Sequence, residues 1–171
     1  LVSTNEANHN VINKADDPRI NLFKNALNDV AIDLAKQIVQ DGEGATKFVE
    51  VIVSGAKNKD IAANIAKSVA NSPLVKTAIY GEDPNWGRVI AAIGKSYEEI
   101  NHESLELFFG EHKIISKGMA LDNYNEEIVM QYMKEDEIQI SIDLGMGSSD
   151  HTVWTCDFSH KYIDINTDYR S

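Results

Sequence analysis

Residues 34–53 read LAKQIVQDGEGATKFVEVIV, and this stretch passes from one periodicity to another. It begins inside an apolar pattern with spacings of three and four residues over Pro18–Gln40, which predicts a long helix packed on one face. Gly42 or Gly44 is suited to the left-handed residue that often ends a helix. The side chains of Thr46–Val53 then alternate and are rich in branched residues, which predicts a strand. The stretch therefore predicts a helix, a tight turn and a strand in succession.

The rest of the chain continues to mix helical and strand patterns. We expect first a turn at 55–58, a helix with Ile61, Ile65 and Val69 on one face, a strand over Leu74–Tyr80 and a helix over Trp86–Ile93. A hairpin of Leu105–Phe109 with Lys113–Ser116 and a short helix over Asn125–Lys134 should follow. The last elements are strands over Ile138–Leu144 and Thr152–Phe158, joined by a hairpin turn at 145–147. These elements predict a mixed α/β (α+β) domain, with helices packed on a mixed sheet, over residues 1–171. Two subdomains dividing near Asn101 are an alternative organisation.

Composition excludes several classes of function. The chain has 171 residues, 43% of them apolar, and a net charge of -11, which is unfavourable for binding nucleic acid or anionic lipid. No apolar stretch approaches the roughly 20 residues that cross a bilayer. A single cysteine cannot form an internal disulfide, so we expect a cytoplasmic protein.

The common chemical motifs are absent from the sequence. The five histidines have no metal-ligand spacing, so we expect no metal site. Cys156 alternates with Trp154 and Phe158, which favours a buried thiol on a strand over a nucleophile. Residues 145–149, GMGSS, lack the lysine and the following helix of a phosphate loop.

Two loops remain open to two interpretations. DGEGATK at 41–47 places carboxylates between glycines at a helix–strand junction, where a backbone can approach a ligand closely, but a solvated turn explains the same residues. In residues 80–88, YGEDPNWGR, Trp86 and Arg88 could form a ligand platform or a packed corner.

Four blocks of sequence resemble the N-acetylornithine:glutamate acetyltransferase family, in family order and spacing. They are LAKQIV with DGEGATKF at 34–48, ANSPLVKTAIYG with DPNWGR at 70–88, WTCD at 154–157, and YIDINTDYRS at 162–171. The resemblance runs from about Phe23 to Ser171 and is weakest between Lys95 and Glu137. It implies part of a self-cleaving, N-terminal-nucleophile type of fold.

The resemblance implies acetyl transfer from N-acetylornithine to glutamate, as a step of arginine biosynthesis, through an acetyl-threonine intermediate. Cleavage exposes the threonine, whose own amine can serve as the general base. The cleavage motif is missing here, and residues 1–6 resemble an internal strand of the family's β chain, so Thr4 is not the nucleophile. We therefore expect this chain to be the C-terminal part of the β chain, to contain no catalytic residue or oxyanion hole, and to be inactive alone.

The family's substrate-binding pattern maps onto three residues of this chain: Glu43, Asn166 and Ser171. Glu43 resembles a carboxylate that lines the pocket and suits a cationic ornithine group. Asn166 and Ser171 resemble a polar pair that contacts substrate, with serine where many relatives have threonine. Lys47 and Arg88 are secondary candidates.

The resemblance also implies the partners. These are the α chain and the upstream part of the β chain, in an α2β2 heterotetramer, with no cofactor and with acetyl-CoA as a potential second acetyl donor. Two other functions fit the same residues: an amidase or aminopeptidase of this fold, and a binding module without catalysis.

Overall fold

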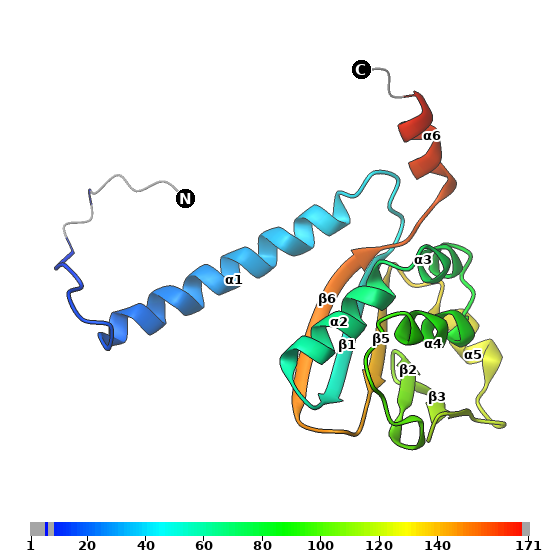
Figure 1. Ribbon diagram of the computed structural model, residues 1–171. Helices are drawn as coiled ribbons and strands as arrows, with labels where there is room; N and C mark the ends of the chain where they lie inside the picture. Colours follow the sequence, from blue (N-terminus) through cyan, green and yellow to red (C-terminus); the bar gives the residue numbers. More distant parts are fainter. Residues whose placement is uncertain (1–5, 7–8, 169–171) are drawn as a thin grey trace. The chain divides into compact units, whose positions relative to one another are not determined.

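The computed structural model describes residue 6 and residues 9–168 of the chain (Figure 1). Contacts divide it into two compact units, Leu1–Lys36 and Gln37–Ser171. In the second unit, the sheet contains strands that precede Asn101 in the sequence and strands that follow it. No helix within the described ranges combines the length and the apolar character needed to cross a membrane.

Helix α1, Pro18–Gln40, covers the range that the apolar periodicity predicted. Asp17 lies at its start, where its carboxylate accepts hydrogen bonds from the backbone nitrogen and Nε of Arg19 at 3.0 and 2.9 Å. These bonds lower the pKa of Asp17 to about 2. The apolar stripe of α1 is exposed among the described residues, as Phe23 and Val30 illustrate at 58% and 57%.

Six strands of the described chain form one mixed sheet, in the order β4-β3-β2-β5-β1-β6. Their bounds are β1 Phe48–Ala56, β2 Glu106–Phe109, β3 His112–Ser116, β4 Met119–Ala120, β5 Glu137–Asp143 and β6 Ser149–Cys156. Strand β1 pairs in parallel with β5 and antiparallel with β6, and β2 pairs antiparallel with both β3 and β5. The mixed α/β class and the hairpin at Gly110 are thus confirmed.

The predicted hairpin between β5 and β6 is wrong, because β1 lies between these two strands. The connecting loop crosses the end of β1: the backbone nitrogens of Leu144 and Met146 donate to the carbonyls of Ser54 and Gly55 at 3.0 and 2.7 Å. The loop therefore carries the chain across the end of β1. The prediction failed because alternation within two strands does not show whether a third strand lies between them.

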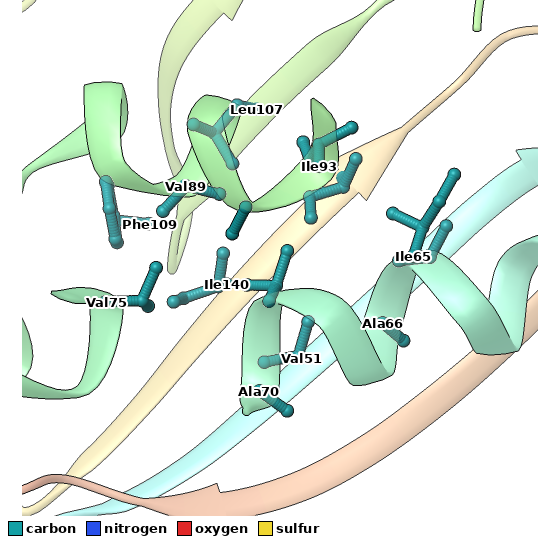
Figure 2. Close-up of a cluster of buried hydrophobic side chains, with 14 of the residues drawn as sticks. Val51, Ile65, Ala66, Ala70, Val75, Val89, Ile93, Leu107, Phe109 and Ile140 are labelled. Carbon is teal, nitrogen blue, oxygen red and sulfur yellow. The ribbon is translucent and has the colours of Figure 1, made fainter. Parts of the chain in front are cut away.

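Several helices follow β1, and the first of them packs closely against the sheet. Their bounds in the second unit are α2 Lys59–Ala70, α3 Pro73–Tyr80, α4 Trp86–Gly94, α5 Glu126–Tyr132 and α6 His160–Asp168. Helix α2 packs on β1 and β6, and α4 packs on α2 and α3. Alanines on α2 allow this close approach. The side chains between the helices and the sheet form one buried hydrophobic cluster, and Figure 2 labels members of it that include Val51, Ala66, Ala70, Val75, Phe109 and Ile140. Each fully buried Val, Ile or Phe side chain in it contributes roughly 1.5–3 kcal/mol to folding.

Residues 74–80 form a helix, so the predicted strand there is wrong. Ser72 is the N-cap of α3, its side chain accepting a hydrogen bond from the backbone nitrogen of Val75, and Pro73 occupies the first turn. Val75, Ala78 and Ile79 are buried at helical spacing. Periodicity alone cannot separate a short apolar helix from a buried strand, and here the Ser-Pro start is the distinguishing signal.

Candidate functional site

The glycine-rich loop after α1 is fixed to the end of β6 by one buried carboxylate. Asp157, 3% exposed, accepts hydrogen bonds from Thr46 N at 2.8 Å, Thr46 Oγ1 at 2.6 Å and Lys47 N at 3.0 Å. A buried carboxylate is stable when several donors surround it, and these three meet that condition. The bonds therefore hold residues 46 and 47, just before β1, against the residue that follows β6.

A second contact fixes the same loop beside α6. The Ser159 hydroxyl donates to the carbonyl of Gly44 at 2.6 Å. Gly44 has φ +70, and a Cβ at this position would lie 2.7 Å from the backbone nitrogen of Tyr162. Only glycine combines this backbone conformation with so close an approach. The loop is thereby presented to the first turn of α6, with Glu43 between its two glycines.

Glu43 and Asn166 are in direct contact. The Asn166 side-chain Nδ2 donates to Glu43 Oε2 at 2.9 Å and also to the carbonyl of Tyr162 at 2.8 Å. Both side chains are exposed. Two of the three residues predicted for the site are thus brought together, and the third, Ser171, lies outside the described residues.

A cavity of about 330 Å³ opens beside Glu43 and reaches across to α3. Its walls come from the loop after α1, the start of α3, and the end of β6 with the first turn of α6: Gly42, Glu43, Asn71, Pro73, Lys76, Cys156, Asp157, Phe158 and Tyr162. The volume is at the lower end of the roughly 300–1,000 Å³ of small-molecule sites. The Phe158 and Tyr162 rings lie 4.6 Å apart, centroid to centroid, and supply an aromatic wall.

Comparison with known proteins identifies the family. A family model described as the ArgJ family matches residues 1–171. The chain belongs to the ArgJ family. The resemblance in the four sequence blocks is therefore confirmed at the level of the family.

The relatives share the name "arginine biosynthesis bifunctional protein ArgJ". The protein from Ruegeria pomeroyi is 54% identical over 87% of this chain and 36% of its own length, and that from Zymomonas mobilis is 45% identical over 99% and 41%. The crystal structure of ArgJ from Bacillus halodurans superposes with a TM-score of 0.87 at 40% identity, covering 94% of this chain and 75% of that one. The chain spans about two fifths of the length of the curated ArgJ relatives.

The two secondary candidates of this ArgJ-family chain have contacts away from Glu43. Lys47 is 7% exposed, and its Nζ donates to the carbonyl of Glu135 at 2.9 Å and lies 3.6 Å from Glu82 Oε1. Arg88 donates to the carbonyl of Leu74 at 2.9 Å and to Thr77 Oγ1 at 3.3 Å, which joins α4 to α3. Both side chains connect structural elements, and neither lines the cavity beside Glu43.

Sequence reasoning missed Lys76 and assigned Cys156 to the core. Lys76 was placed on a strand, whereas its position on α3 brings Nζ to 3.1 Å from Thr155 Oγ1 and 3.8 Å from Cys156 Sγ. Cys156 does lie on a strand, but it is half-buried and lines the cavity. The helix start at 72–73 was the signal that could have placed Lys76 correctly. Among the described residues, no group of three or more His, Cys, Asp or Glu side chains is arranged to hold a metal.

Proposed function

We propose that this chain forms the substrate-binding wall of an enzyme that transfers the acetyl group of N-acetylornithine to glutamate in arginine biosynthesis. Membership of the ArgJ family supports the reaction class. The observation that carries the proposal for this chain is the hydrogen bond, at 2.9 Å, between Asn166 and Glu43, which lines the cavity. It joins two separately predicted substrate residues that are 123 positions apart.

Glu43 has the role of binding the cationic end of an ornithine derivative. A carboxylate paired with an ammonium group makes a charge-assisted hydrogen bond, which is about twice as strong as a neutral one. Asn166 donates both N–H groups within the chain, one of them to Glu43 Oε2, and so fixes the orientation of that carboxylate. Its Oδ1 accepts no hydrogen bond from the described residues, which leaves it for a substrate N–H.

The chemical step belongs to residues upstream of this chain. A threonine freed by self-cleavage takes the acetyl group and passes it to glutamate, so one difficult transfer becomes two easier ones. The proposed assembly includes the α chain and the upstream part of the β chain, in an α2β2 heterotetramer in the cytoplasm. No cofactor is needed, and acetyl-CoA is a candidate second acetyl donor.

The test is to express the chain together with the upstream part that full-length relatives possess, and to supply N-acetylornithine and glutamate. Formation of N-acetylglutamate and ornithine supports the proposal. Acetate in place of N-acetylglutamate would identify an amidase, and neither product from a self-cleaved protein would identify a binding module; both contradict the proposal.

A further inference from the structure

Lys76 is a positive charge in the wall of the cavity that the glycine-rich loop also lines. It is half-buried on α3, whereas Glu43 comes from the loop after α1, and both line the same cavity of about 330 Å³. None of the ion pairs among the described residues includes Lys76; they join Arg19, Lys47, Lys57 and Lys113 to carboxylates. In a chain with a net charge of -11, this cation lines a cavity and forms no ion pair with an acidic side chain of residue 6 or residues 9–168.

The neighbours of Lys76 orient its ammonium group without neutralising it. Nζ donates to Thr155 Oγ1 at 3.1 Å and lies 3.8 Å from Cys156 Sγ. Thr155 Oγ1 donates in turn to the carbonyl of Ala70 at 3.2 Å. This second bond fixes the orientation of the hydroxyl that accepts the hydrogen bond from Lys76. An ammonium group carries three N–H donors, so capacity remains for an anionic group of a ligand.

We propose that Lys76 binds the α-carboxylate of the N-acetylornithine substrate while Glu43 binds its amine, an inference that rests on the proposed function. The ligand class follows from the lining: the Glu43 carboxylate, the Lys76 ammonium group and the Phe158–Tyr162 aromatic pair line one cavity, and together they suit a short amino acid with an aliphatic stem. Lys76 is then a specificity residue for substrates that carry a carboxylate beside the acetylated nitrogen.

The test compares two acetyl donors with the full-length enzyme. N-acetylornithine carries the carboxylate, and N-acetylputrescine is the same molecule without it. For the wild type, removal of the carboxylate should lower kcat/KM roughly 10- to 100-fold, the range expected for one charge-assisted hydrogen bond. With Lys76→Gln the two donors should differ by no more than about 3-fold, and Lys76→Arg should restore part of the preference.

The matched control is Lys67→Gln, an exposed lysine on α2 that does not line the cavity; it should keep the wild-type preference. The preference is the ratio of kcat/KM for N-acetylornithine to kcat/KM for N-acetylputrescine, measured within each variant. A loss of stability or of total activity therefore does not obscure this ratio. An undiminished preference in Lys76→Gln overturns the inference. A wild type that transfers no acetyl group contradicts the proposed function, and calorimetric binding of both donors to the same variants then tests Lys76 separately.

Discussion

The side-chain amide of Asn166 donates a hydrogen bond to Glu43 Oε2 at 2.9 Å, linking α6 to the loop that follows α1. The contact depends on a scaffold of buried groups behind it. Asp157 and Ser159 hold the loop, and glycine at position 44 allows the backbone of α6 to approach it. The exposed pair is thus placed by buried residues behind it, Asp157 and Ser159.

Replacing Glu43 by Gln in the full-length enzyme should weaken binding of ornithine derivatives. The substituted side chain keeps its size and loses its charge, so KM for N-acetylornithine should rise roughly 10-fold or more. The proposed self-cleavage should be unchanged, because the proposal places the cleaved bond outside this chain. Steady-state kinetics and gel analysis of processing measure the two effects, with the exposed Glu127→Gln on α5 as control. Unchanged kinetics would remove Glu43 from the site.

Asp157→Asn should destabilise the second unit. The variant keeps one acceptor oxygen where the wild type has two charged ones, which accept three hydrogen bonds while almost fully buried. We expect a loss of about 2–4 kcal/mol in the free energy of unfolding, measured by urea denaturation. The exposed Asp122→Asn should change it by less than about 0.5 kcal/mol. Equal effects of the two substitutions would contradict the role of Asp157.

Gly44→Ala and Gly94→Ala should have different effects on stability. Alanine at 44 adopts φ +70 only with strain, and its Cβ would lie 2.7 Å from Tyr162 N, so we expect a loss of about 1–3 kcal/mol. At Gly94, at the end of α4, nothing lies within 4 Å of the added Cβ, so alanine should be neutral or stabilising by up to about 1 kcal/mol. Thermal unfolding of both variants checks this order, and a reversed order would show that the backbone of the loop is not constrained as described.

Tyr132 should make stability depend on pH in the alkaline range. Burial raises its pKa above the ordinary 10.0, so the folded chain retains a proton that the unfolded chain releases. The contribution is fully present below pH 10 and is lost as pH rises toward the folded pKa. Urea denaturation between pH 9 and pH 11 should show a steeper fall for wild type than for Tyr132→Phe.

The same Tyr132→Phe variant should also be less stable at neutral pH. In the wild type, the backbone nitrogen of Gln139 donates a hydrogen bond to the Tyr132 hydroxyl at 2.7 Å. Removing the hydroxyl leaves this nitrogen without that acceptor, at a cost of about 1–2 kcal/mol in the free energy of unfolding. Tyr97→Phe, at a side chain 94% exposed, is the control for both measurements. Parallel pH curves for wild type and Tyr132→Phe would exclude Tyr132 as the titrating group.

Local patterns in the sequence predicted the elements whose periodicity is visible within a short window. Alternation placed β1 and β5, helical spacing placed α1 and α2, and the helix predicted from Trp86 does begin there as α4. One error, the strand predicted at 74–80, overlooked a local helix start at 72–73, and the other occurred where distant contacts decide the outcome. The insertion of β1 between β5 and β6 is a long-range pairing that no window of sequence contains.

The residues of the candidate site also divide into those that the sequence predicted and those that it did not. Periodicity and composition left the loop at 41–47 ambiguous, and only the family blocks selected Glu43 and Asn166. Nothing in the spacing of the chain predicts that Asp157 holds this loop, because 111 positions separate it from Thr46. Lys76 was hidden by the incorrect strand at 74–80.

The most direct test of the shared substrate wall is a double-mutant cycle on Glu43 and Asn166, using the KM for N-acetylornithine of the full-length enzyme. Because Asn166 orients Glu43, Asn166→Ala should raise KM clearly less in the Glu43→Gln background than in the wild type, and the remaining effect measures the contact of its Oδ1 with substrate. Fully additive effects of the two substitutions would show that the residues act independently and would contradict the account.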